Sequence, residues 1–132
     1  TENYVDIYLN SFLNFYLIWN TGIGFGLFSS EENLYYNLIT ILIVLINIII
    51  LIMVIKSQDY KIFFLLMILG GSFGNLFDRV YYKAVPDFID LHYGNFHWFV
   101  FNVADIFITI GIMCLIIVEF ILNNKKQNNE KT

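Results

Sequence analysis

Charged residues are scarce in this chain of 132 residues: they make up 14% of it, whereas hydrophobic residues make up 58%. About a quarter of the residues in an ordinary soluble domain are charged. The composition therefore excludes a soluble domain and predicts a membrane protein. The formal net charge is −4, and no nucleic-acid partner is expected.

Cysteine and the common metal and nucleotide motifs are also scarce. Cys114 is the only cysteine, so the chain can form no internal disulfide. We interpret its thiol as a small apolar group within a membrane span. No CxxC, HExxH or GxxxxGK[ST] pattern occurs. We therefore expect the chain to use neither a cofactor nor a metal ion.

Long hydrophobic runs, by contrast, dominate the chain. A helix needs roughly 20 apolar residues to cross the hydrocarbon core of a bilayer. Three runs are candidates for such spans, at residues 34–55, 62–79 and 104–122. They predict a mainly α membrane protein, a helical transmembrane bundle that forms one domain over residues 1–132.

The positions of the lysines predict the orientation of these spans. Lys56 and Lys61 lie between the first two runs, and further lysines lie in the tail 123–132. We expect both places to be cytoplasmic, which puts residues 1–33 and the loop 80–103 at the outer face. An outward N-terminal region needs a preceding segment to carry it across the membrane. Because the chain begins at Thr1, we expect a first transmembrane helix before it, and four spans in the full-length protein.

Other stretches predict local structure. Residues 4–19 are rich in aromatic and β-branched residues, which favours extended or interfacial structure at the outer face. The alternating Gly22, Gly24 and Gly26 are typical of a bent strand or a closely approached loop. The small residues at 70–74 are spaced as in closely packed membrane helices. The polar tail after Leu122 is predicted to be disordered.

Polar residues at the ends of the spans are functional candidates, because a charge inside a membrane helix costs about 2.5–3.5 kcal/mol. Asn75, Asp78 and Arg79 are spaced to share one face of the second helix. They predict either a structural polar clasp at the outer end of that helix or part of a functional site.

Two aspartates, Asp87 and Asp105, are placed at the outer membrane edge on adjacent elements. Asn102 is positioned to cap the third helix, which leaves Asp105 free inside the first turn. Two carboxylates brought close cannot both be ionised cheaply, so one of them holds a proton. Such a pair can activate water against a peptide bond, one carboxylate as base and the other as acid, and it titrates as a unit.

Four motifs in order, NTGIGFGLF, GNLFDR, VPDF and FNVAD, resemble those of the lipoprotein signal peptidase family, signal peptidase II. The resemblance extends from about residue 12 to residue 122. It implies a membrane aspartic endopeptidase of the bacterial cytoplasmic (inner) membrane. It also implies a four-helix fold with a small β-cradle at the outer, periplasmic face, where the active site lies. The implied substrate is a prolipoprotein carrying diacylglycerol on a cysteine, cut just before that cysteine, and cyclic-peptide or macrolactone antibiotics are implied as inhibitors.

The resemblance also assigns roles to individual residues. It implies that Asp87 and Asp105 form the catalytic dyad. Two departures from the family motifs concern loop geometry rather than chemistry. Pro86 replaces the usual valine, and Phe99 and Val100 stand where a proline-containing stretch commonly precedes the FNxAD motif. The other matching residues are implied to line or support the substrate cleft: Asn20, Gly22, Gly74, Asn75, Asp78, Arg79 and Asn102.

Two alternatives remain beside this interpretation. Carboxylates and imidazoles bind Zn or Mn, so a metal site is conceivable from Asp87, Asp90, His92, His97 and Asp105. The two histidines lack helical ligand spacing, and His97 with Trp98 is more simply interpreted as an interfacial anchor. The second alternative is a small transporter or channel subunit with a buried Asp78–Arg79 pair. Its flux would survive Asp87→Asn, whereas peptidase activity would not.

Overall fold

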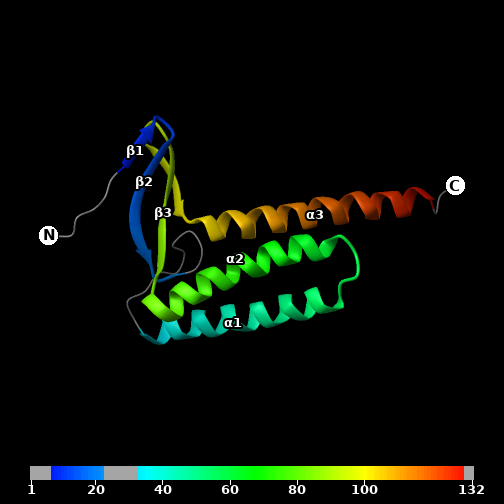
Figure 1. Cartoon of the computed structure of the whole chain (residues 1–132). Helices are drawn as coiled ribbons and strands as arrows, with labels where there is room; N and C mark the ends of the chain where they lie inside the picture. Colours follow the sequence, from blue (N-terminus) through cyan, green and yellow to red (C-terminus); the bar gives the residue numbers. More distant parts are fainter. Residues whose placement is uncertain (1–6, 23–32, 130–132) are drawn as a thin grey trace.

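The computed structural model of the chain describes residues 7–22 and 33–129, which form three long helices and one four-stranded sheet (Figure 1). The helices run side by side, and the sheet stands across one end of them. The predicted architecture, mainly α with a small sheet, is therefore confirmed. The elements in chain order are β1 (Ile7–Asn10), β2 (Leu13–Asn20), α1 (Asn33–Lys56), α2 (Lys61–Tyr82), β3 (Val85–Tyr93), β4 (Phe96–Phe101) and α3 (Val103–Asn129).

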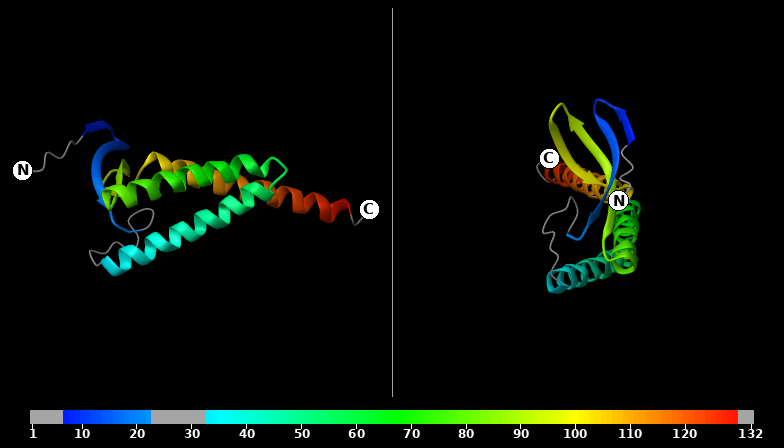
Figure 2. Two further views of the ribbon diagram at one scale, coloured as in Figure 1. Left: turned by 60° about the horizontal axis from the view of Figure 1, so that its bottom comes forward. Right: turned by 90° about the vertical axis from the view of Figure 1, so that its left-hand side faces the viewer.

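All three helices are long and apolar enough to cross a membrane, over Leu34–Lys56, Lys61–Tyr82 and Val103–Gln127. In the most apolar window of α1 only 6% of the residues are buried, against 22% in α2. The difference follows from the arrangement, since α2 lies between α3 and α1 (Figures 1 and 2). Helices that expose apolar side chains all round are suited to contact with lipid.

The third helix is longer than predicted. We predicted disorder after Leu122, but α3 continues to Asn129, so this prediction is wrong for residues 123–129. The segment is polar, yet it contains neither glycine nor proline. Lys126 in the last turn also complements the negative end of the helix dipole. The helix therefore continues beyond its apolar part, because no residue in this segment breaks it.

Helices α2 and α3 pack closely through glycines. A Cβ atom at Gly71 would lie 2.5 Å from the backbone oxygen of Ala104, and one at Gly111 would lie 2.9 Å from a backbone oxygen of α2. A Cβ atom at Gly74 would make an ordinary 3.8 Å contact with Ala104, and one at Gly70 would meet nothing within 4 Å. Small residues do allow the predicted close approach, but Gly71 makes the tightest contact on α2.

The sheet is antiparallel throughout, in the order β1-β2-β3-β4. It joins two distant segments, because β2 pairs with β3 from Leu13 opposite Leu91 to Asn20 opposite Val85. The extended structure predicted near the N-terminus is present as β1 and β2. Gly94 has a φ of 59° at the first position of the two-residue turn between β3 and β4, where a type II′ turn takes glycine.

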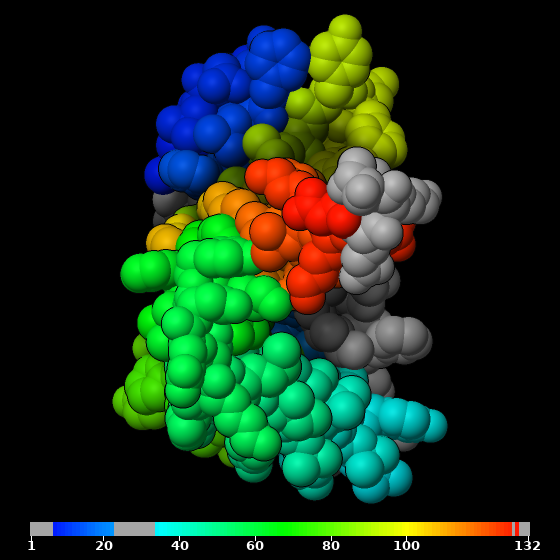
Figure 3. Space-filling model, turned by 90° about the vertical axis from the view of Figure 1, so that its right-hand side faces the viewer, coloured from blue at the N-terminus to red at the C-terminus, as the bar shows by residue number. Residues whose placement is uncertain are grey.

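The sheet is fixed to one end of the helix bundle. α2 ends just before β3, and β4 leads directly into α3. In Figure 3, viewed along the helices from the end of α3, the strands project beyond the helices on the side of α3. The predicted loop containing Gly24 and Gly26 lies outside the described residues.

The lysine-bearing segments lie at the other end of the bundle. The connection between α1 and α2 and the last turns of α3 are both remote from the sheet (Figure 1). At that end Lys61 forms an ion pair with Glu119, which links α2 to α3. The two segments predicted to share one side of the membrane thus share one end of the molecule.

We expect Gly71→Ala to lower the thermal midpoint of unfolding, because its Cβ atom would collide with the backbone of α3. Overpacking of this kind typically costs about 1–3 kcal/mol. Gly70→Ala is the matched control, since its Cβ atom enters open space. Thermal unfolding in detergent measures both variants, and equal midpoints for the two would contradict the packing described here.

Candidate active site

The first turn of α3 holds Asn102 and Asp105 in a reciprocal cap. The backbone N–H of Asp105 donates to Asn102 Oδ1 at 3.1 Å, and the backbone N–H of Asn102 donates to Asp105 Oδ2 at 3.2 Å. This is the geometry of a capping box, with an aspartate in the third helical position. Asn102 caps the helix as predicted. Asp105 is not free, however, because it completes the cap.

Asp87 reaches the same place from β3. Asn20 Nδ2 donates to Asp87 Oδ2 at 2.9 Å, and Asn102 Nδ2 donates to Asp87 Oδ1 at 2.8 Å. The side-chain nitrogen of Asn102 thus contacts Asp87, and its side-chain oxygen holds the turn that contains Asp105. The side chain of Asn102 therefore links the two carboxylates predicted to form a pair.

A second asparagine closes the network from α2. Asn75 Nδ2 donates to Asp105 Oδ1 at 2.9 Å, and Asn75 Oδ1 accepts from Asn102 Nδ2 at 3.0 Å. We call the five connected residues the dyad cluster: Asn20, Asn75, Asp87, Asn102 and Asp105. Both carboxylates are buried, Asp87 at 2% exposure and Asp105 at 7%.

The dyad cluster changes the acidity of Asp87. Burial raises the pKa of the Asp87 carboxyl above its ordinary value, and the amides of Asn20 and Asn102 offset part of this by favouring the ionised form. The charge of Asp105 raises the pKa of Asp87 further, and that of Arg79 lowers it. A carboxylate pair that holds its proton above the usual pH range can supply both an acid and a base.

Arg79 is not part of the dyad cluster, but it holds the backbone that follows Asn20. Its buried guanidinium donates to the carbonyl oxygens of Thr21, at 3.3 Å, and Gly22. It also lies over the ring of Tyr36, 5.2 Å from the ring centre, and the Tyr36 hydroxyl donates to the Arg79 carbonyl. The N–H of Gly22 in turn donates to Asn20 Oδ1 at 2.8 Å. Arg79 therefore fixes the turn that holds Asn20 against Asp87.

Two of the candidate residues lie beside this network. Asp78 is half-buried on α2, and no hydrogen bond or ion pair joins it to another residue in the described part of the chain. Neighbouring residues on a helix point to different sides, so Asp78 and Arg79 do not form the pair considered from the sequence. Gly74 lies at the α2–α3 contact beside Ala104, where it supports packing.

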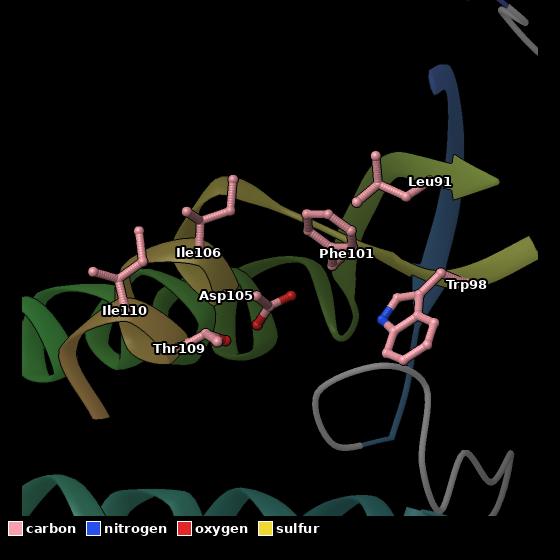
Figure 4. Close-up of a pocket in the computed structure, with 7 residues that line it drawn as sticks. All are labelled: Leu91, Trp98, Phe101, Asp105, Ile106, Thr109 and Ile110. Atoms are coloured by element: carbon pink, nitrogen blue, oxygen red, sulfur yellow. The ribbon is translucent and has the colours of Figure 1, made fainter. Parts of the chain in front are cut away.

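An apolar pocket of about 240 Å³ adjoins Asp105. In Figure 4 the Asp105 carboxylate points into the space between α3 and the side chains of β4. A mostly apolar wall with a small number of polar groups is typical of a ligand pocket. The other lining residues are Leu91, Trp98, Phe101, Ile106, Thr109 and Ile110.

Sequence reasoning missed this pocket and the role of Tyr36. The pocket residues come from β3, β4 and α3, so they converge only once the strands are paired. Tyr36 lies in an apolar run, where a tyrosine usually indicates an interfacial position. Its hydrogen bond to the Arg79 carbonyl joins α1 to α2. No local pattern in the sequence signals such a contact.

The fold and the site together define a multi-pass membrane protein with a buried pair of aspartates beside an apolar pocket. A family model described as signal peptidase (SPase) II matches residues 1–121. The chain belongs to the signal peptidase II family, so it is a membrane protease, and the resemblance seen in its motifs is confirmed. The transporter alternative is not favoured.

Individual relatives agree with this assignment. The chain is 60% identical over 129 residues to the lipoprotein signal peptidase of Pelagibacter ubique (strain HTCC1062), covering 98% of this chain and 78% of the relative. It is 43% identical over 120 residues to that of Blochmanniella pennsylvanica (strain BPEN), covering 85% of this chain and 72% of the relative. The relatives and the three apolar helices indicate a bacterial multi-pass membrane protein.

Two solved bacterial membrane enzyme structures have a similar fold. One matches with a TM-score of 0.69 at 27% identity, covering 92% of this chain and 73% of that one. The other matches with a TM-score of 0.62 at 29% identity, covering 91% of this chain and 77% of that one. Both likenesses extend over the sheet as well as the helices, because they cover nine-tenths of the chain.

We expect Arg79→Lys to lower both the thermal midpoint and the rate of peptide cleavage. A lysine keeps the charge but lacks the planar fork that contacts two carbonyl groups at once. Loss of a buried hydrogen-bonded contact typically costs about 1–3 kcal/mol. Lys83→Gln, at an exposed cation at the same end of the bundle, is the control. Wild-type stability in Arg79→Lys would show that the guanidinium does not hold the turn.

Proposed function

We propose that this protein is an aspartic endopeptidase that removes the signal peptide from prolipoproteins, cutting just before a cysteine that carries diacylglycerol. The observation that carries the proposal is the linkage of two buried carboxylates, Asp87 and Asp105, by the single side chain of Asn102. Family membership supports the protease class. The names of the relatives support a lipoprotein substrate.

The chemistry requires one proton shared by Asp87 and Asp105. The ionised carboxylate takes a proton from water as the water oxygen bonds to the scissile carbonyl carbon, and the protonated carboxyl gives its proton to the carbonyl oxygen. The resulting tetrahedral intermediate then breaks its C–N bond. The leaving nitrogen takes the proton removed from water, and the hydroxyl proton returns to the second carboxylate. The two carboxylates act as one unit, so neither role is assigned to one residue.

The three asparagines of the dyad cluster position this chemistry. Each amide N–H₂ group donates to a carboxylate, so it fixes the direction of the oxygen atoms. Reacting groups held in the right geometry save much of the entropy cost of bringing them together. Asn20, Asn75 and Asn102 are therefore positioning residues in the proposed mechanism.

The surroundings of Asp105 suit a substrate anchored in lipid. The apolar pocket beside this carboxylate can take the hydrophobic residues next to the scissile bond. The dyad cluster lies where the sheet meets the helix ends. The α1–α2 connection and the last turns of α3, which carry most of the lysines, lie at the opposite end (Figure 1). By the positive-inside rule, the lysine end faces the cytoplasm. The proposed active site then faces the periplasm from the inner membrane, near the surface where a diacylglyceryl group is anchored.

We expect Asp87→Asn and Asp105→Asn each to reduce cleavage by at least about 100-fold, because each removes one partner of the acid–base pair. The assay is cleavage of a diacylglyceryl-modified prolipoprotein by the full-length protein in detergent, with a chelator in a parallel reaction. Asp59→Asn, in the connection between α1 and α2, is the matched control and keeps full activity. Near-normal activity in either dyad variant, or loss of activity with chelator at a temperature where the protein stays folded, would refute the proposed dyad.

The raised pKa of Asp87 predicts how stability depends on pH. A carboxyl group that binds its proton more tightly in the folded state stabilises the fold at low pH, and this contribution is lost as pH rises through the raised pKa. We therefore expect Asp87 to contribute a decrease in the thermal midpoint of unfolding as pH rises above about 4, the ordinary pKa of aspartate. Asp87→Asn lacks this decrease.

Thermal unfolding across a pH series in detergent measures the slope for both proteins. The same slope in Asp87→Asn as in the wild type would contradict the raised pKa.

A further inference from the structure

The hairpin of β3 and β4 brings a carboxylate and both histidines of the chain together, away from the dyad cluster. Asp90 and His92 point to the same face of β3, because side chains alternate along a strand. His92 pairs directly with His97 on β4. Asp87 is separated from Asp90 by an odd number of residue steps, so it points to the other face. The five residues considered from the sequence as one metal site therefore divide into two groups.

The geometry of this second group matches that of a metal site. His97 Nδ1 lies 2.9 Å from Asp90 Oδ2, and His92 Nδ1 lies 3.6 Å from the same oxygen. One ligand atom from each of the three residues lies within 4.8 Å of the others. Tetrahedral zinc with bonds of about 2.0–2.1 Å places its ligand atoms about 3.4 Å apart. The His97 side chain is 51% exposed, so a small movement of it can bring the three ligand atoms to the spacing that zinc requires.

A hydrogen bond between Asp90 and His97 does not by itself account for the group. The Asp90 side chain is completely buried, and that of His92 is only 9% exposed. His92 Nδ1 is buried and has no hydrogen-bond partner in the described part of the structure. A buried polar atom without a partner costs about 1–3 kcal/mol. This nitrogen lies 3.6 Å from Asp90 Oδ2, and a cation bound by both atoms would supply the missing contact.

We propose that Asp90, His92 and His97 bind one zinc-class divalent ion. Two imidazoles and one carboxylate suit zinc and its neighbours in the first transition row, whereas magnesium and calcium prefer oxygen ligands. The exposed side of His97 leaves a fourth position for water. This assignment replaces the interpretation of His97 as an interfacial anchor and departs from the expectation that the chain binds no metal.

The ion is structural in this proposal. Its ligands lie on both strands of one hairpin, so it clips β3 to β4. β3 carries Asp87, and β4 leads directly to Asn102. The clip therefore stabilises the hairpin that positions Asp87 and Asn102, but the ion itself contacts neither Asp87 nor Asp105.

The test uses the full-length protein in detergent, purified with a tag that contains no histidine and stripped with a chelator. Equilibrium dialysis against Zn²⁺ alone gives stoichiometry and affinity, and thermal unfolding with Zn²⁺ or Mg²⁺ gives the shift in midpoint. We expect one Zn²⁺ per chain and a higher midpoint with Zn²⁺ but not with Mg²⁺. His92→Gln and His97→Gln each weaken binding by about 100-fold, because one of three ligands is lost.

Two controls separate this site from its surroundings. Tyr93→Phe, at the exposed neighbour of His92, keeps wild-type affinity for Zn²⁺. Asp87→Asn also keeps wild-type affinity for Zn²⁺, although it no longer cleaves the prolipoprotein. Failure of the metal site and failure of the catalytic dyad are therefore distinguishable. Absence of stoichiometric Zn²⁺ binding in the wild type, unchanged affinity in His97→Gln, or loss of binding in Asp87→Asn would each overturn the proposal.

Discussion

The hydrogen bonds of Asn102 hold the sheet and the helix bundle together at the site. Burying two carboxylates is costly unless their oxygens have donors. All four oxygens of Asp87 and Asp105 have one, and Asn102 supplies two of these donors, one from its amide and one from its backbone. The other two donors come from Asn20 at the end of β2 and Asn75 on α2. The site therefore forms only when strand, helix and cap are docked together.

The packing of α2 against α3 provides this docking. Gly71 lets α2 approach Ala104 in the first turn of α3 so closely that no side chain fits between them. Asn75 lies one helical turn beyond Gly71 on the same face of α2. It therefore reaches Asp105 directly. A packing contact between two membrane helices thus also sets the distance between an amide and a carboxylate.

Local patterns predicted the spans, because lipid demands apolar runs, and they predicted the cap at Asn102. They also predicted that Asp87 and Asp105 lie in one region, and the structure joins both residues through Asn102. Contacts between distant segments were not predictable in this way. Asn20 meets Asp87 through the pairing of β2 with β3, and Arg79 binds backbone carbonyls rather than its neighbour Asp78. The helical end of α3 did not follow from composition, because a polar segment without glycine or proline can continue a helix.

The alternation of side chains along β3 has a consequence for how this chain tolerates changes in length. Asp87 faces one side of the strand, and Asp90 and His92 face the other. Inserting or deleting one residue between Asp87 and Asp90 turns every side chain beyond that point to the opposite side. Such a change would bring Asp90 to the face that Asp87 now occupies. An inserted residue is therefore expected to disturb the site less in the turn Gly94–Asn95 than within β3.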